Sequence, residues 1–258
     1  MPGLLSPEGF DMAYNQYMDF VVTKLNNLTA GTEFAEKDAL QIVRETARQP
    51  HQAALFNYAS MAWNHNFFFE QLARLESAVP GRPPEEVGFA PVTMPSQLQK
   101  SLEDQFGTIE TLRREMTITA DVMFGPGFVW LIKQPRTAEY RVLPTYLAGT
   151  PYLTAHWRRQ GVDLNTHAGA ASPDSAATGR EYLDRAQAAV GATAAGQFDT
   201  PPGSGELIPL LCLSTWQHVW LRDWGIAGKL DFAEAWWDCV DWRKVEALAL
   251  GKLSMKIK

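Results

Sequence analysis

The stretch ASMAWNHNFFF, residues 59–69, decides the fold that this sequence is expected to adopt. It lies within a segment from Gln52 to Leu75 whose apolar and aromatic residues recur at helical spacing, so the segment predicts a helix with a broad buried face. Toward the N-terminus, Ser6-Pro7-Glu8 has the form of an N-cap followed by proline in the first turn, and the apolar pattern beyond it predicts a long amphipathic helix reaching Leu25. A short helix is expected between Phe34 and Arg48. The two long helices are predicted to pack antiparallel.

Proline and glycine mark a change of organisation further along the chain. Gly81-Arg82-Pro83-Pro84 and residues 91–95 predict a boundary between a domain at 1–90 and a second domain at 91–258. The second domain is expected to contain helices near 96–106 and 109–123, strands at 128–133, 140–146 and 207–213, and terminal helices near 216–224, 232–239 and 242–250. Residues from about 151 to 203 are rich in Ala, Gly, Ser, Thr and Pro, and they are expected to form a flexible insertion outside the core.

The composition restricts the classes of protein that remain. The chain has 258 residues, of which 46% are hydrophobic, and this is enough for one or two packed domains. A formal net charge of -6 argues against a broad basic surface for nucleic acid, because neutralising phosphates requires clustered Lys and Arg. Two cysteines without CxxC spacing exclude a disulfide framework. The longest uncharged stretches are interrupted by polar residues, so no membrane span is expected, and the first residues lack the pattern of a secretory or transit peptide.

Two histidines stand in aromatic surroundings on predicted helices. These are His65, in Trp63-Asn64-His65, and His218, in Trp216-Gln217-His218. A redox-active metal site recruits three or four N or O ligands including a carboxylate, and neither histidine has a carboxylate at the appropriate helical spacing. Taken alone, each is better explained by a histidine that packs in the core or at an interface than by a metal ligand.

The surroundings of both histidines resemble the iron/manganese superoxide dismutase family. ASMAWNHNFFF resembles the family's AAQVWNHTFYW, and STWQHVWL at 214–221 resembles its DVWEHAYY. Between them FGPGFVWL at 124–131 resembles FGSGWTWL, and AGTP at 148–151 resembles part of NAGTPL. The similarity covers nearly the whole chain except the insertion. It implies an α+β fold with an N-terminal helical hairpin domain, followed by an α/β domain with a small three-stranded antiparallel sheet and flanking helices.

The resemblance also shows where this sequence departs from the active members, which hold their metal with three histidines and one aspartate. The retained positions fall on His65 and His218, whereas the first histidine falls on Ala13 and the aspartate falls on Ser214. The gateway tyrosine falls on Val21, and the glutamine that holds the metal-bound water falls on Met61 or, in the manganese type, Phe124. Because second-sphere groups orient ligands and tune bound solvent, their loss adds to the loss of ligands. We therefore expect no metal, no cofactor and no catalytic residue.

The residues that would join two subunits are changed as well. In the family, a glutamate before the last histidine and a tyrosine after it reach the partner subunit, and here these positions are Gln217 and Leu221. The family histidine that meets that tyrosine falls on Tyr17. Aromatic residues near these positions are suited to a protein interface. The interface candidates are Tyr17, Trp216, Gln217, Trp220, Leu221 and Trp224, with a core role as the alternative for each tryptophan.

A fold that is kept while its metal chemistry is removed implies a structural or interaction role. The sequence resembles the superoxide-dismutase-like proteins in the small subunit of fungal mitochondrial ribosomes, which pair with each other. The resemblance implies a structural ribosomal protein of the mitochondrial matrix that forms a heterodimer with a related superoxide-dismutase-like chain and contacts other small-subunit proteins, with no membrane role. Limited rRNA contact is left open, through Arg113-Arg114, Arg158-Arg159, Lys252, Lys256 and Lys258. Two alternatives remain, an active dismutase with a remodelled site and a free-standing scaffold.

Overall fold

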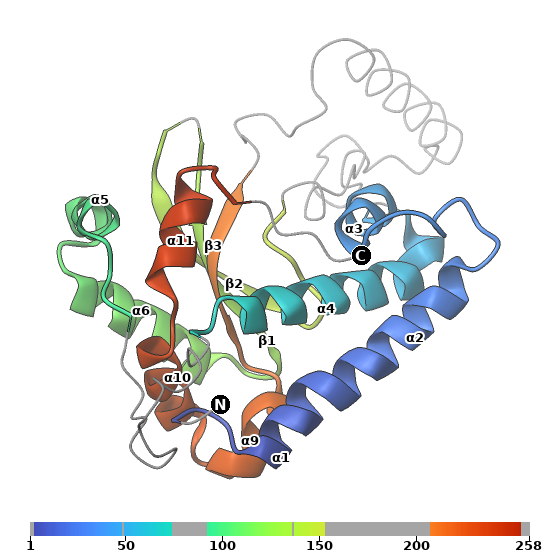
Figure 1. The fold of residues 1–258 in the computed structure, drawn as a ribbon, viewed down its shortest axis with the longest axis horizontal. Helices are drawn as coiled ribbons and strands as arrows, with labels where there is room; N and C mark the ends of the chain where they lie inside the picture. Colours follow the sequence, from blue (N-terminus) through green and yellow to red (C-terminus); the bar gives the residue numbers. More distant parts are fainter. Residues whose placement is uncertain (1–2, 48, 74–91, 136, 153–206, 254–258) are drawn as a thin grey trace, which may run out of the picture.

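The structure, a computed structural model, describes residues 3–47, 49–73, 92–135, 137–152 and 207–253. Its N-terminal part is helical. A continuous helical run contains α1 (Pro7–Phe10), the π-helix η1 (Asp11–Gln16) and α2 (Tyr17–Thr29), and it is followed by α3 (Ala39–Thr46), the short 3-10 turn η2 (Pro50–Gln52) and α4 (Ala53–Glu70). Figure 1 shows α2 lying alongside α4 in the opposite chain direction, as the sequence predicts.

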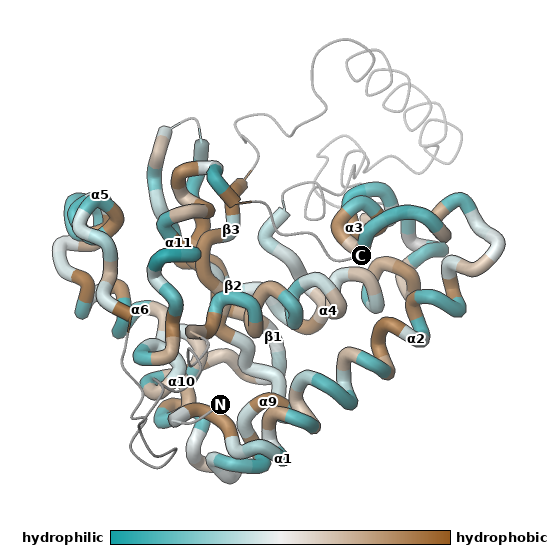
Figure 2. Tube along the Cα trace, viewed as in Figure 1, coloured by the Kyte–Doolittle hydropathy of each residue, from teal (hydrophilic) through white to brown (hydrophobic). Residues whose placement is uncertain are grey.

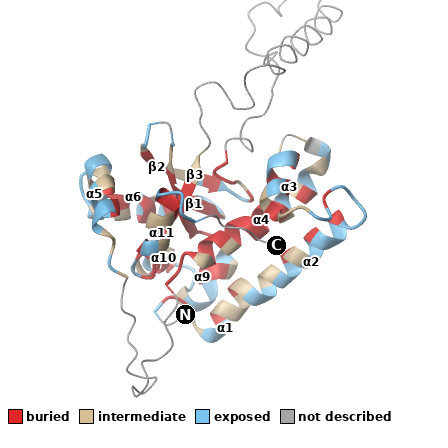
Figure 3. Cartoon of the chain, turned by 45° about the horizontal axis from the view of Figure 1, so that its top comes forward, coloured by how far each residue is buried: buried red, intermediate tan, exposed pale blue. Residues whose placement is uncertain are grey.

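Local sequence signals determine where the first and third helices begin. The Ser6 hydroxyl accepts the Gly9 N–H at 2.9 Å, and Asp38 and Gln41 form a reciprocal capping box at the start of α3. By contrast, α4 has no side-chain cap. Most of its residues are buried, as its red colour in Figure 3 shows, so tertiary packing holds this helix in place.

Three antiparallel strands form the sheet, in the order β2-β1-β3. The strands are β1 (Gly127–Lys133), β2 (Tyr140–Tyr146) and β3 (Ile208–Ser214). In the central strand β1, Trp130 lies opposite Leu143 of β2 and Cys212 of β3. Gly127 opens β1, and a Cβ atom there would collide with the carbonyl oxygen of Thr145 on the neighbouring strand, which explains the glycine at this point of the FGPGF turn.

The remaining helices surround this sheet. They are α5 (Ser96–Phe106), α6 (Ile109–Val122), α9 (Gln217–Trp224), α10 (Lys229–Asp238) and α11 (Trp242–Ala249). Helix α6 packs against all three strands, and α4 and α11 pack against β3. In Figure 2, β3 is hydrophobic along most of its length, while α2 alternates between polar and apolar turns. The expected α+β fold is therefore confirmed.

The end of α4 joins the helical part to the sheet. The buried Gln71 side chain accepts the Cys212 N–H at 2.9 Å and donates to the Leu210 carbonyl, so its amide pairs with the outer edge of β3. Its backbone carbonyl accepts the Asp241 N–H at 2.9 Å, and the Ala73 N–H is donated to the Cys239 carbonyl at 2.7 Å. Both parts of the chain thus share one hydrogen-bonded seam.

The predicted boundary at residue 90 and nearly all of the predicted insertion at about 151–203 lie outside the described residues. The division into two domains therefore remains a prediction. Within the described part of the chain, no helix is both long and apolar enough to cross a membrane.

Candidate functional site

The two histidines singled out by the sequence meet in the interior. His65 comes from the middle of α4, and His218 comes from the first turn of α9. Their Nε2 atoms lie 2.7 Å apart, which is a direct imidazole–imidazole hydrogen bond. The ring centroids are 4.8 Å apart and the ring planes differ by 16°, so the two rings lie edge to edge in nearly one plane, with their Nε2 atoms facing each other. Residues 153 positions apart in the chain are therefore joined without any intervening group.

Tyr17 covers the histidine pair from the start of α2. Its ring stacks on His218 with centroids 3.9 Å apart and lies 4.6 Å from the ring of His65. Phe128 of β1 presents an edge to His65 at 5.7 Å. We refer to Tyr17, His65 and His218 as the ring triad. The sequence placed Tyr17 among the interface candidates, and the structure puts its ring against both histidines.

The two substituted ligand positions are small and buried. Ala13 is fully buried in the π-helix η1, which packs against α9, and Ser214 is fully buried at the end of β3. The Ser214 hydroxyl accepts the Trp216 N–H at 3.4 Å, a long bond. Val21 and Met61 are buried as well, whereas the Phe124 side chain is 96% exposed. None of these residues supplies a carboxylate.

Burial controls the protonation of the ring triad. Desolvation lowers the pKa of His65 well below its usual value, and the neighbouring charge of His218 lowers it further. Desolvation also lowers the pKa of His218 to about 4. For Tyr17, desolvation followed by the neighbouring Tyr58 raises the pKa to about 12. All three side chains are therefore neutral at physiological pH.

The aromatic interface candidates on and beside α9 differ in exposure. Trp220 is buried and donates to the Thr215 carbonyl at 3.2 Å, while Trp216 and Trp224 are half-buried. Trp224 donates to the Leu4 carbonyl at 2.9 Å. Gln217 and Leu221 are exposed, so these two candidates lie on the outer face of α9.

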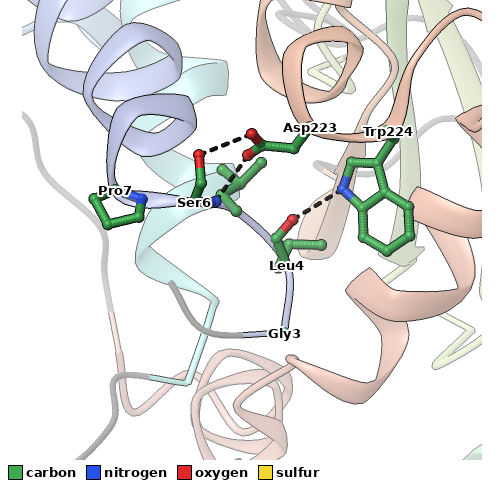
Figure 4. Close-up of a pocket in the computed structure, with 7 residues that line it drawn as sticks. Gly3, Leu4, Ser6, Pro7, Asp223 and Trp224 are labelled. Carbon is green, nitrogen blue, oxygen red and sulfur yellow. Dashed lines mark hydrogen bonds between the residues drawn. The ribbon is translucent and has the colours of Figure 1, made fainter.

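The N-terminal segment forms a clasp with α9 that sequence reasoning missed. The Asp223 carboxylate accepts both the N–H and the hydroxyl of Ser6, each at 2.8 Å, and Figure 4 shows these bonds beside the one from Trp224 to Leu4. The carboxylate also lies at the positive end of the first helical run. No local motif marks this contact, because its partners are 217 residues apart.

A second feature that the sequence did not reveal is a group of exposed apolar side chains near the FGPGF turn. Phe124, Tyr146 and Leu147 are 96%, 53% and 59% exposed. The Leu147 N–H is donated to the Pro126 carbonyl at 2.9 Å, which brings the two loops together. Tyr146 ends strand β2, whereas Phe124 and Leu147 lie in the adjoining loops, and apolar residues at these exposed positions are the one available sequence signal.

Together, the helical hairpin, the three-stranded sheet and the hydrogen-bonded histidine pair define the class of protein as an α+β fold of the superoxide dismutase type. Comparison with known proteins agrees. The sequence profile described as iron/manganese superoxide dismutases, C-terminal domain, matches residues 94–169 and 178–248. The chain belongs to the iron/manganese superoxide dismutase family.

Individual relatives fall into two groups. The chain is 28% identical to small ribosomal subunit protein mS43 of Schizosaccharomyces pombe over 94% of this chain and 78% of that protein. It is 26% identical to small ribosomal subunit protein mS42 of the same organism over 78% of this chain and 69% of that protein. It is also 30% identical to the iron superoxide dismutase of Campylobacter coli, over 57% of this chain and 61% of the enzyme.

The residues present do not fit the iron or manganese that the family implies. With the metal–nitrogen distance of about 2.1 Å found for imidazole ligands, nitrogens 2.7 Å apart would subtend only about 80° at a shared metal. That angle is below both tetrahedral and octahedral values. Among the described residues, no group of three or more His, Cys, Asp or Glu side chains is arranged to hold a metal.

Proposed function

We propose that this chain is a structural constituent of the small subunit of the mitochondrial ribosome, where it acts as a protein-interaction block and not as a dismutase. The observation that carries the proposal is the similarity to ribosomal protein mS43 along 94% of this chain. The similarity to the dismutases of Campylobacter coli and Salmonella typhimurium covers 57% and 64% of it. The chain resembles the ribosomal proteins over a longer span than it resembles the enzymes.

The geometry of the ring triad supports a role without catalysis. A dismutase needs a metal that cycles between two oxidation states and a bound solvent molecule tuned by neighbouring polar groups. Here two neutral imidazoles bond to each other, and Ala13 and Ser214 stand where the resemblance places a histidine and an aspartate. Such a pocket offers neither an anionic ligand nor an open coordination position.

Sedimentation of the tagged chain tests the ribosomal role. Mitochondrial extract would be centrifuged through a sucrose gradient at high salt, with small-subunit rRNA and a matrix enzyme as markers. We expect the chain to migrate with the small-subunit rRNA, and to leave those fractions when the subunit is dissociated with EDTA. A chain that stays at the top of the gradient in both conditions would be a free-standing scaffold, and the ribosomal proposal would be wrong.

The rival function is an active iron or manganese dismutase, favoured by 30% identity to the Campylobacter enzyme. Purified chain would be assayed for superoxide consumption, and its iron and manganese would be measured by mass spectrometry. We expect no activity above that of the His65→Ala, His218→Ala double variant. Activity that disappears in the double variant would establish the rival.

We also propose a heterodimer with a second chain of this fold, through the outer face of α9 and the neighbouring FGPGF turn. The Thr215 N–H is donated to the Gly127 carbonyl at 2.9 Å, so the start of α9 and this turn are adjacent. Leu221 and Phe124 supply exposed apolar surface there, which suits the centre of an interface. mS43 and mS42 are two such relatives in one organism.

Substitutions on that face test the heterodimer. We expect Leu221→Arg and Phe124→Asp to abolish co-purification of the related chain, because each places a charge in a desolvated contact. Leu28→Arg serves as the control, since Leu28 is similarly exposed at the far end of α2. If all three variants recover the related chain equally, the interface does not lie on this face of α9 and the FGPGF turn.

Contact with rRNA would be limited in this proposal. Of the predicted basic pair, Arg113 forms salt bridges with Glu110 and Glu234, whereas Arg114 is exposed. The first arginine is already neutralised within the chain, and a net charge of -6 favours contacts with proteins.

A further inference from the structure

A direct hydrogen bond between His65 and His218 closes the position that a metal takes in the enzymes of this family. The Nε2 atoms of His65 and His218 are 2.7 Å apart, and an ion ligated by both would need them to separate. The two rings are also nearly parallel, with an interplanar angle of 16°. Because the rings are nearly coplanar and their Nε2 atoms face each other across 2.7 Å, no space is left between them for an ion.

The surroundings determine which histidine is the donor. A neutral imidazole carries one N–H, and His65 Nδ1 is buried without a hydrogen-bond partner among the described residues. An N–H buried without an acceptor is rare in folded proteins, so the proton of His65 belongs on Nε2. His65 Nε2–H therefore donates to His218 Nε2, and His218 carries its own proton on Nδ1.

Tyr17 encloses this bond from the side of α2. The His218 ring is stacked under Tyr17 at 3.9 Å, and the edge of Phe128 approaches His65 at 5.7 Å. Aromatic contacts of this kind contribute about 0.5–1.5 kcal/mol beyond area burial. The ring triad thus connects α2, α4 and α9, each of which supplies one of the three rings.

We propose that the former metal position has become a metal-free structural cross-link, in which His65 donates to His218 under the ring of Tyr17 and joins α4 to α9. This assigns to the retained histidines a packing role that requires their direct contact. It is independent of whether the chain sits on a ribosome, because it concerns only the folded chain.

Nitrogen NMR of the intact chain tests the assignment directly. With uniform 15N labelling, we expect His65 in the Nε2–H tautomer and His218 in the Nδ1–H tautomer near pH 7, with a downfield-shifted proton on His65 Nε2. The signals of exposed His51 provide the reference. Rapid averaging of tautomers at His65 would overturn the proposal, since a ring with a fixed donor role cannot exchange its proton freely.

A double-mutant cycle measures the cross-link. The single variants His65→Ala and His218→Ala and the double variant would be unfolded in urea, with His51→Ala as the control. We expect a coupling of roughly three- to tenfold in the unfolding equilibrium constant, the range of one intramolecular hydrogen bond. Additive effects would mean that the histidines do not support each other. If a single histidine variant does not fold, Tyr17→Phe and Tyr17→Ala replace it. Tyr17→Phe keeps the ring and should leave His65 in the Nε2–H tautomer, whereas Tyr17→Ala removes the ring and should allow His65 to exchange between tautomers.

Metal loading separates a cross-link from a hidden metal site. The purified chain would be dialysed anaerobically against Fe²⁺ or Mn²⁺, and bound metal would be compared with the His65→Ala, His218→Ala variant as the baseline. We expect equal, substoichiometric metal in both proteins. About one metal per chain that is lost in the variant would overturn the proposal, even if the chain sediments with the small ribosomal subunit.

Discussion

Replacing Gln71 with leucine tests whether the seam between α4 and the sheet holds the molecule together. The residue is fully buried, and its side-chain amide pairs with the Cys212 N–H and the Leu210 carbonyl on the outer edge of β3. Leucine has nearly the same volume but can satisfy neither group. Leaving a buried donor or acceptor without a partner costs about 1–3 kcal/mol each.

Two such groups set the size of the effect. Together they would reduce the free energy of unfolding by roughly 2–6 kcal/mol, and the added apolar surface of leucine recovers part of this loss. We therefore expect Gln71→Leu to reduce the stability by about 3 kcal/mol, equivalent to a fall in Tm of roughly 6–12 °C in a chain of this size. That is a large fraction of the total stability of an ordinary domain.

Urea unfolding followed by circular dichroism measures the change in stability. An unchanged m-value would indicate that both proteins expose the same surface on unfolding. The control is Gln99→Leu on α5. Gln99 is exposed and donates to Glu103 at 2.8 Å, so this substitution should alter stability by less than about 0.5 kcal/mol. A Gln71→Leu variant as stable as the control would refute the reasoning, because water or neighbouring groups would then be satisfying the edge of β3.

Two further predictions concern α9. Gly9→Ala should reduce stability by about 1–3 kcal/mol in thermal melts, because the new Cβ would collide with the Asp223 carboxylate, and adding Asp223→Ala should recover part of that loss. Stability should also fall as the pH drops from 6.5 toward 4, since His65 and His218 have lowered pKa values in the folded chain and protonate first in the unfolded chain. With a folded pKa of about 4, His218 contributes up to about 3 kcal/mol to this loss. Urea unfolding at several pH values measures it. If the urea midpoint of the His65→Ala, His218→Ala variant falls with pH as steeply as that of the unmodified chain, the two histidines are not the cause of the loss.

The elements that could be predicted from the sequence are those with local signals. Ser6-Pro7 marked the start of the first helical run, and strand β1 followed the glycines of the FGPGF turn. The π-helix η1 was not predicted, because the shift of its hydrogen bonds by one residue leaves no mark in apolar spacing. Helical spacing also could not tell that Trp220 faces the core, since aromatic residues suit both a core and an interface.

The candidate site shows the same division. The resemblance identified His65 and His218 as retained positions, but their direct contact depends on how α9 packs against α4 and η1, which no local pattern specifies. Tyr17 illustrates the difference most clearly. Its position in the family's pattern suggested an interface, which stays a prediction, and no local pattern indicated that its ring lies on the two histidines. The exposed candidates Gln217 and Leu221 remain a prediction for the partner surface.

The proposed absence of a metal raises a physical question about how the fold remains stable. A metal held by groups from the first helix, α4, β3 and α9 would cross-link all four elements, and binding free energy of that kind adds directly to folding. In this chain, hydrogen bonds and ring contacts connect the same elements. Tyr17 and the histidine pair join α2, α4 and α9, Gln71 joins the end of α4 to β3, and Asp223 fastens α9 to the start of α1. The three sets lie at different points of the molecule, so their effects should add. A protein that serves as a rigid block needs only such packing, so its metal ligands are free to change while the fold is kept.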